Sequence, residues 1–209
     1  MSLLRPIRLL PVIAALLAPA TLFGAVPSNP NVAPSHASLA GQLLIATPAM
    51  GDPRFQNTVL VMVRHNADGA MGIVINRPIG EQSLADLLQV LGEKSEGVSG
   101  TVPVFVGGPV QRELGFVLHS TDYRGPKTLD VTGEVALTTT AEIFRDIAAN
   151  TGPKKILLAI GYAGWAPGQL ENELAHNAWY TAPLDPKLVF DADRDKVWEL
   201  AVERRTRDL

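Results

Sequence analysis

Residues 41–76 read GQLLIATPAMGDPRFQNTVLVMVRHNADGAMGIVIN, and this stretch decides the fold. Its apolar segments 41–47, 58–65 and 70–76 have the composition of β-strands. A Pro- and Gly-rich loop separates the first segment from the second, because proline cannot join a central ladder. In the turn 66–69, Asn and Asp can bond nearby backbone groups and glycine accepts a positive φ. The stretch therefore predicts one strand followed by a β-hairpin.

The rest of the chain alternates between helical and strand patterns. Apolar residues at helical spacing predict helices after Ser83 and after Thr139, each the first residue of a capping box. Two more helices are predicted, at 169–179 and in the tail from Asp193. Further strands are predicted at 102–107, 114–120, 134–139, 155–163 and 188–190. The first two of these form a hairpin candidate through a Gly-Gly-Pro turn. The fourth is apolar almost throughout, which is typical of an interior strand covered on both faces. The pattern is α+β with a mixed sheet.

Composition narrows the class of protein. The 209 residues suit one domain, and 46% hydrophobic with 19% charged residues indicates a globular chain rather than a disordered one. Cysteine is absent, which excludes disulfides, a thiolate metal site and a cysteine nucleophile. The formal net charge of −3 gives no general attraction to nucleic acid. Because no basic stripe or helix-turn-helix pattern occurs either, we expect no direct nucleic-acid binding.

Residues 1–20 have the order of a secretory signal peptide. Arg5 and Arg8 precede an apolar run over 9–17, and Ala18-Pro19-Ala20 supplies a small-x-small cleavage pattern. The run is too short to span a bilayer, so we expect no stable membrane anchor. An amphipathic start, or a start codon assigned too far upstream, would produce a similar pattern.

The domain boundaries follow from this interpretation. Residues 21–38 are rich in Pro, Ser and Asn without periodicity and are predicted to be a linker. Residues 39–209 form the predicted folded domain. We expect an exported, periplasmic protein if the N-terminus is correctly assigned, and a cytoplasmic one otherwise.

Two histidines, His65 and His119, are considered as functional residues and as structural ones. His65 and Asn66 stand at a strand end beside a turn, a common place for functional side chains and equally for residues that bond local backbone. His119 is followed by Ser120 and lies near Asp122. These three do not form a hydrolytic triad, because neighbouring strand residues point to opposite faces of the sheet.

Two other motifs are weak signals of ligand chemistry. Glu173 and His176 have the i, i+3 spacing of a metal half-site. A di-metal site needs a second half-site, so we predict an exposed helical pair and no bound metal. The segment 107–109, Gly-Gly-Pro, is predicted to be a tight turn and not a phosphate cradle, because a strand follows it. Arg112 just beyond this turn could receive an anionic ligand.

The segment around Trp165 is the least ordinary part of the sequence. Trp165 stands close to Gly164 and Gly168 and precedes a predicted helix that begins at Gln169. The tryptophan and the glutamine could line a pocket or a partner surface. Alternatively, Trp165 closes the end of the core while the two glycines permit the bend.

Three long motifs resemble the YqgE/AlgH family of bacterial proteins. They are GQLLIATPAMGDPRFQNTVLVMVRHNADGAMGIVINRP, VGGPVQRELGFVLH and GYAGWAPGQLENELAHNAWY, and the resemblance covers about residues 39–203. It implies a single α+β domain in which a mixed sheet is curved into a flattened barrel with surrounding helices. It also implies a protein of unsettled molecular activity, with one branch linked to regulation, and it brings no catalytic residues or cofactor.

The matching motif positions supply the candidate binding residues, which are His65, Asn66, Asn76, Arg77, Trp165 and Gln169. Two features depart from the family pattern. Members commonly carry a Cys-Glu pair where Val63-Arg64 stands here, which excludes a thiol or acid function at that point. Members also usually begin near the first strand, so residues 1–38 are an addition.

Two hypotheses about function come from these observations. The first is a non-enzymatic regulatory domain, or a domain that binds a protein or small-molecule partner, with no cofactor and no metal. The alternative is an enzyme of unknown reaction whose polar pocket is formed by His65, Asn76, Arg77 and His119. The absence of an acid–base constellation favours the first hypothesis.

Overall fold

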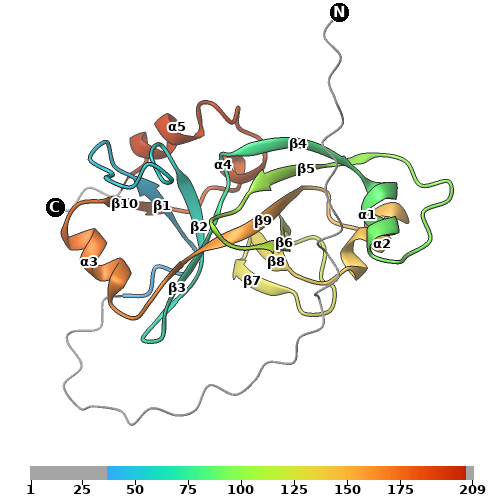
Figure 1. Cartoon of the computed structure of the whole chain (residues 1–209), viewed down its shortest axis with the longest axis horizontal. Helices are drawn as coiled ribbons and strands as arrows, with labels where there is room; N and C mark the ends of the chain where they lie inside the picture. Colours follow the sequence, from blue (N-terminus) through green and yellow to red (C-terminus); the bar gives the residue numbers. More distant parts are fainter. Residues whose placement is uncertain (1–36, 206–209) are drawn as a thin grey trace, which may run out of the picture.

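The computed structural model describes residues 37–205, so the predicted signal peptide and all but the last two residues of the predicted linker lie outside the described part. The strands are β1 (Gln42–Ala46), β2 (Val59–Asn66), β3 (Gly69–Val74), β4 (Pro78–Ser83), β5 (Thr101–Val106), β6 (Val110–Ser120), β7 (Leu129–Thr132), β8 (Val135–Thr138), β9 (Ile156–Trp165) and β10 (Trp179–Pro183). The helices are α1 (Leu84–Val90), α2 (Glu142–Ala148), α3 (Gln169–Ala175), α4 (Pro186–Phe190) and α5 (Val197–Glu203). Helices α1 and α2 lie at one end of the elongated body and α3 at the other (Figure 1).

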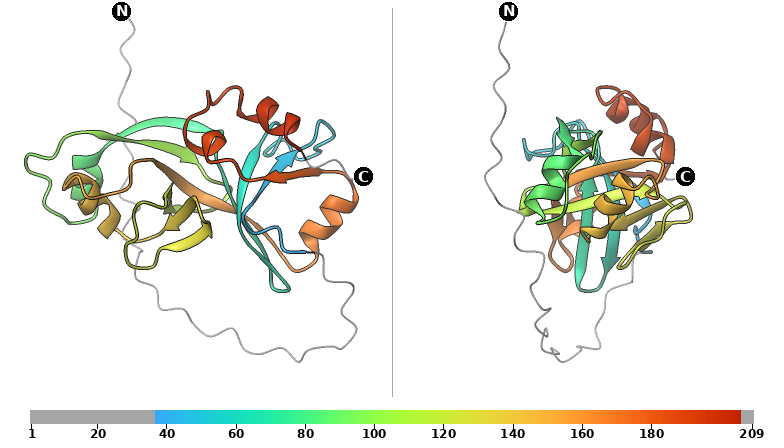
Figure 2. Two further views of the ribbon diagram at one scale, coloured as in Figure 1. Left: turned by 180° about the vertical axis from the view of Figure 1, so that it is seen from behind. Right: turned by 90° about the vertical axis from the view of Figure 1, so that its right-hand side faces the viewer.

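The strands join into one connected sheet. Its main path runs β10-β1-β2-β3-β9-β6-β8-β7, and β4 and β5 pair with each other beside this path. Strand β5 runs parallel to β9, whereas the other pairs are antiparallel. The sheet curls strongly, as the two views in Figure 2 show. The predicted α+β fold, with a curved mixed sheet and surrounding helices in a single domain, is confirmed.

Strand β9 is the centre of the sheet and has neighbours on both edges. One edge pairs with β6, and the other pairs first with β5 and then with β3. The predicted hairpin of β5 with β6 is therefore wrong, because β9 lies between these two strands. The segment 107–109 crosses over β9 instead of forming a tight hairpin turn. This crossing brings backbone against backbone, which explains the glycines.

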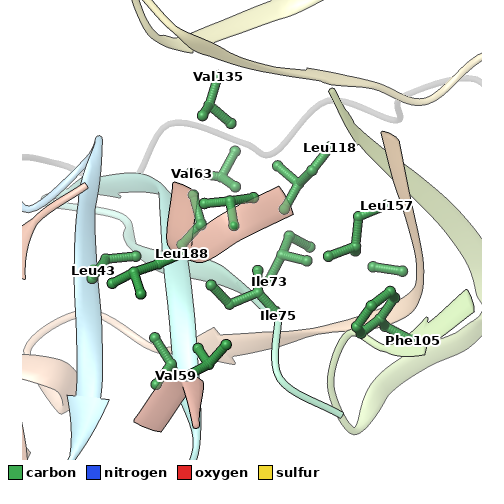
Figure 3. Packing of buried hydrophobic residues seen from close by; sticks show 14 of the residues in the cluster. Leu43, Val59, Val63, Ile73, Ile75, Phe105, Leu118, Val135, Leu157 and Leu188 are labelled. Atoms are coloured by element: carbon green, nitrogen blue, oxygen red, sulfur yellow. The ribbon is translucent and has the colours of Figure 1, made fainter. Parts of the chain in front are cut away.

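The apolar strands β1, β2 and β3 are buried on both faces. Alternate residues such as Leu43, Val61 and Ile73 join a core cluster with Leu188 and Val197 from α4 and α5. Figure 3 shows the packing of this cluster, in which side chains from the first three strands meet Phe105, Leu118 and Leu157. The intervening residues, among them Leu44, Leu60 and Met62, pack under α3. Burial of both faces explains why these segments are continuously apolar instead of alternating.

A third cluster lies at the opposite end, where α1 and α2 cover β5, β6 and β9. The predicted stripe of α1 is confirmed, since Leu84, Leu87 and Leu88 are buried there. Ser83 caps α1 by accepting a hydrogen bond from the Asp86 backbone N–H at 3.3 Å. The predicted capping box of α2 is wrong, because its N-cap is Ala141 and no side chain caps it.

Other differences concern short elements. Residues 188–190 belong to α4 and not to a strand, because Asp185 caps this helix and Pro186 occupies its first position. The helix predicted at 169–179 is shorter than expected: α3 ends at Ala175, and Trp179 is the first residue of β10. Strands β4 and β7 were not predicted, because both are largely exposed edge strands without a hydrophobic pattern.

The helices within residues 37–205 are short, and none of them is both long and apolar enough to cross a membrane.

Candidate functional site

A cleft opens where the end of β9, helix α3 and the start of β10 meet the loop between β1 and β2. Its volume is about 370 Å³, within the range of about 300–1,000 Å³ typical of small-molecule sites. The residues that define its chemistry are Phe55, Trp165, Gln169, Glu173 and Trp179. We call this site the aromatic cleft.

The carboxylate of Glu173 organises the aromatic cleft. Its Oε2 atom accepts hydrogen bonds from the indole Nε1–H groups of Trp165 and Trp179, at 2.9 and 2.7 Å. Its Oε1 atom accepts a hydrogen bond from Gln169 Nε2 at 2.9 Å. Both tryptophans are almost fully buried, so their N–H groups need a protein partner. One side chain of α3 thereby fixes the orientation of both indole rings.

The three aromatic rings pack edge to face. The ring centroids of Trp165 and Trp179 lie 5.9 Å apart with an interplanar angle of 79°. The ring centroids of Phe55 and Trp179 lie 5.6 Å apart with an interplanar angle of 69°. Such T-shaped pairs direct the positive edge of one ring at the negative face of the next. The loop between β1 and β2 is joined to the cleft by this contact.

An ion pair lies in the same loop, at the rim of the cleft. The Arg54 guanidinium binds the carboxylate of Asp52, with Nη2 2.7 Å from Oδ2. The side-chain hydrogen bonds from Arg54 hold the pKa of Asp52 below its ordinary value, although burial acts in the opposite direction. Arg54 also lies 5.9 Å from the centre of the Phe55 ring. The charge of Asp52 is therefore neutralised inside the loop.

Local backbone geometry places α3 under the cleft. Gly168 adopts φ 75°, a left-handed conformation that suits glycine, and α3 begins at the next residue. Gln169 Oε1 accepts the backbone N–H of Ala166 at 3.1 Å, which ties the helix to the end of β9. On the other side, Trp165 pairs with Ala70 of β3. The helix that carries Glu173 is thus fixed directly after the strand that carries Trp165.

Two of the six candidate binding residues, Trp165 and Gln169, line the aromatic cleft. The two interpretations of Trp165 coexist in the structure. It is only 6% exposed and packs in the core cluster beneath α3, and it also forms part of the cleft wall.

His65 lies outside the cleft and forms hydrogen bonds that connect parts of the fold. Its Nδ1 atom accepts the backbone N–H of Leu39 at 3.0 Å, and its Nε2 atom lies 2.8 Å from Glu171 Oε1. Because Nδ1 is an acceptor, the neutral ring carries its proton on Nε2 and donates it to Glu171. His65 thereby links the start of the domain to α3. Asn66, next to it, accepts the Asp68 backbone N–H at 2.9 Å and stabilises the hairpin turn.

Asn76 and Arg77 lie together against residues 56–59. Asn76 accepts the backbone N–H of Val59 at 3.0 Å and donates to the carbonyl of Asn57 at 2.8 Å. Arg77 Nη2 donates to Thr58 Oγ1 at 2.8 Å and to a backbone carbonyl of the same loop. Burial lowers the pKa of Arg77. This pair holds the loop that precedes β2, and neither residue lines the aromatic cleft.

His119 is fully buried at a different place, between β6 and β8. Its Nε2 atom lies 2.9 Å from Thr138 Oγ1, and its Nδ1 atom lies 2.9 Å from the carbonyl of Ser120. Its hydrogen-bond partners are not shared with those of His65, Asn76 or Arg77. The geometry therefore gives no support to a single polar pocket formed by these four residues.

The sequence and the fold of the chain are similar to those of known proteins. A family model described as AlgH-like matches residues 43–209, which include every residue of the aromatic cleft. The chain belongs to the AlgH-like family. This AlgH-like chain is 45% identical over 179 residues to a UPF0301 protein of Afipia carboxidovorans, covering 82% of the chain and 85% of the relative. It is 48% identical over 159 residues to one of Rhodospirillum rubrum, covering 76% and 83%.

Two solved structures are similar to the AlgH-like chain. The solution structure of the AlgH protein from Pseudomonas aeruginosa has a TM-score of 0.67 and 42% identity, covering 86% of this chain and 92% of that one. The crystal structure of a Corynebacterium diphtheriae protein has a TM-score of 0.65 at 19% identity, covering 82% and 89%. The second likeness concerns the fold alone.

Glu173 was not among the binding residues predicted from the sequence of the AlgH-like chain, although it contacts both tryptophans of the cleft. The predicted helical pair with His176 is wrong, because His176 Nδ1 contacts the Asn172 carbonyl at 2.8 Å while Glu173 turns toward the indoles. The i, i+4 spacing of Gln169 and Glu173 was an available signal of their contact. Nothing in the sequence pointed to Phe55, because it lies in the loop between β1 and β2, far from Trp179 along the chain.

Within residues 37–205, no cluster of three or more His, Asp or Glu side chains is arranged to hold a metal ion.

The buried His119 predicts a loss of stability in acid. Burial lowers the pKa of His119 from 6.5, and the Ser120 carbonyl and Asp122 oppose this effect only partly. The unfolded chain therefore binds a proton near pH 6.5 that the folded chain binds only at lower pH. The contribution of His119 to stability is complete above pH 6.5 and falls as the pH drops below it, by at most about 1.4 kcal/mol per pH unit.

Urea unfolding of the wild type and of His119→Gln between pH 7.5 and 5 measures this effect. The wild type should lose more stability than the variant over this interval, since other titrating groups contribute equally to both. Equal losses would show that His119 is not responsible.

Proposed function

We propose that the AlgH-like chain is a ligand-binding domain with regulatory rather than catalytic activity, and that the aromatic cleft is its binding site. The observation that carries this proposal is the convergence of three aromatic rings and a fixed carboxylate on a cleft of about 370 Å³. Small-molecule sites are concave and largely apolar, with a few polar groups held in place to set orientation. The aromatic cleft has each of these properties.

The chemistry of the lining residues favours binding over catalysis. The titratable carboxylates of the cleft are those of Asp52 and Glu173. Asp52 is held by Arg54, and both oxygens of Glu173 accept hydrogen bonds from fixed N–H donors. General acid–base catalysis needs a group within reach of the substrate proton and free to exchange it. Side chains already committed to fixed donors are better suited to orienting a ligand.

The indole resonances in an ¹H–¹⁵N NMR spectrum test the proposed function. The chain has three tryptophans, of which Trp165 and Trp179 line the cleft. Trp198 donates its indole N–H to the Ala46 carbonyl and packs against the core cluster that contains Leu188 and Val197, outside the cleft. Its indole signal is therefore an internal reference for shifts caused by binding in the cleft. Screening a library of amino acids, amines, sugars and nucleosides should yield compounds that shift the two cleft signals in a saturable way and move Trp198 much less.

A matched pair of glutamine variants makes this test specific. Gln169→Ala removes a polar group of the cleft and should weaken binding about three- to tenfold. Gln89→Ala makes the same change on the exposed surface of α1, away from the cleft, and should leave affinity unchanged. If no compound shifts the cleft signals, or if both variants bind as the wild type does, the aromatic cleft is not the binding site.

A further inference from the structure

The carboxylate of Glu173 has no cationic partner within the described part of the chain. The ion pairs among residues 37–205 do not include it, and its hydrogen-bond donors are the neutral groups of Trp165, Trp179 and Gln169. Hydrogen bonds from neutral donors orient a carboxylate but leave its net charge in place. Glu173 thus contributes one negative charge to the aromatic cleft that nothing beside it neutralises.

The other charges of the cleft do not change this balance. Asp52 and Arg54 are the remaining charged residues in its lining. Arg54 commits both Nε and Nη2 to the carboxylate of Asp52, at 2.7–3.1 Å, so the pair is neutral as a unit. A bound anion would meet the unneutralised Glu173 and would have to compete for Arg54. The electrostatics of the cleft therefore favour a cation.

The aromatic walls add a second preference for cations. The face of an aromatic ring carries negative charge density, and Trp is the strongest partner for an organic cation, followed by Tyr and Phe. In the cleft, Trp165, Trp179 and Phe55 stand nearly perpendicular to their neighbours, at 69° and 79°. All three side chains nevertheless line the same cleft, so its wall offers aromatic surface to a ligand, and aromatic surface is what surrounds alkylated ammonium groups in proteins.

We infer that the aromatic cleft selects a compact alkylated ammonium ion, held by the charge of Glu173 and the faces of the aromatic rings. This inference rests on the proposed function and names the ligand class of the same site. The ammonium ion belongs either to a free metabolite of the choline type or to a methylated lysine side chain of a partner. A cleft of about 370 Å³ admits the ammonium group together with part of the rest of the ligand.

Choline and its neutral isostere 3,3-dimethyl-1-butanol are the probes that test this inference. The two have the same shape, so a difference in affinity reports the charge. Titrations of the full chain at constant ionic strength should show choline shifting the Trp165 and Trp179 indole signals with an affinity about tenfold or more above that of the alcohol. A short peptide with one trimethyl-lysine is the third probe. Tighter binding of the peptide would assign the cation to a partner, and tighter binding of choline would assign it to a metabolite.

Two glutamate variants on the same helix provide the matched comparison. Glu173→Gln removes the charge of the cleft and keeps an oxygen that can accept the indole N–H groups, so choline affinity should fall about tenfold. Glu171→Gln makes the same change two residues earlier, where the side chain contacts His65 outside the cleft, and choline affinity should be unchanged. Thermal unfolding of both variants confirms that they are folded before titration.

Several outcomes would overturn the cation inference. These are equal affinity for choline and the alcohol, unchanged choline binding in Glu173→Gln, or no saturable shift with any of the three probes. If the cations fail while another compound of the library shifts the two cleft indoles, the ligand class is wrong and the proposed function stands. If no compound of either set shifts them, both proposals are wrong.

Discussion

Replacing Gly108 with alanine should lower the free energy of unfolding by about 3 kcal/mol or more. Gly108 lies in the crossover that passes over β9, and a Cβ atom there would overlap the backbone of Tyr162 and Ala163. Backbone atoms cannot move aside as a flexible side chain can. A second close approach lies beside it, because a Cβ atom at Gly161, which adopts φ 74°, would lie 2.6 Å from the Gly108 carbonyl oxygen. Urea unfolding measures the loss.

Gly133→Ala is the matched control for this prediction. Gly133 lies in the turn between β7 and β8, and a Cβ atom there would meet nothing within 4 Å. Its substitution should change stability by about 0.5 kcal/mol or less. If Gly108→Ala were as stable as Gly133→Ala, the crossover would have room to move away from β9, and the proposed close contact would be refuted.

Replacing Glu173 with leucine should destabilise the protein by about 2–4 kcal/mol. The substitution leaves the indole N–H groups of Trp165 and Trp179 without an acceptor, and both side chains are at least 94% buried. Each unsatisfied buried donor costs about 1–3 kcal/mol. The loss is to be measured by urea unfolding, with the two indole NMR signals as reporters of the local structure.

The control for Glu173→Leu is the same change at Glu199, which is exposed on α5. Glu199→Leu should alter the unfolding free energy by about 0.5 kcal/mol or less. The variant Glu173→Gln keeps an acceptor oxygen and should lose less than half as much stability as Glu173→Leu. A leucine variant with wild-type stability and unshifted indole signals would show that the carboxylate does not organise the two tryptophans.

Part of the candidate site was predictable from the sequence. Trp165 and Gln169 stood out because glycines and a helix start surround them, and both line the aromatic cleft. The other four candidates, His65, Asn66, Asn76 and Arg77, bond backbone or neighbouring side chains outside the cleft. A motif indicates that a residue type is required at a position. It does not distinguish a residue that holds a loop from one that meets a ligand.

Glu173 illustrates why the remainder was not predictable. Spacing along α3 placed it near both Gln169 and His176, and either contact agrees with helical geometry. Two tryptophans decided the outcome, because their buried N–H groups required an acceptor and Glu173 supplied it. Burial of that kind depends on how β9, α3 and β10 pack together, which no local pattern records.

The sequence by itself determined the elements with strong patterns. The apolar segments of β1, β2, β3 and β9 and the buried stripe of α1 are encoded by periodicity, since each element must bury its own apolar side chains. Only the tertiary structure decided that β9 enters between β5 and β6 and that Phe55 meets Trp179. The physical reason is that a pattern shows which face of an element is buried, whereas the choice of partner depends on contacts between segments far apart in the chain.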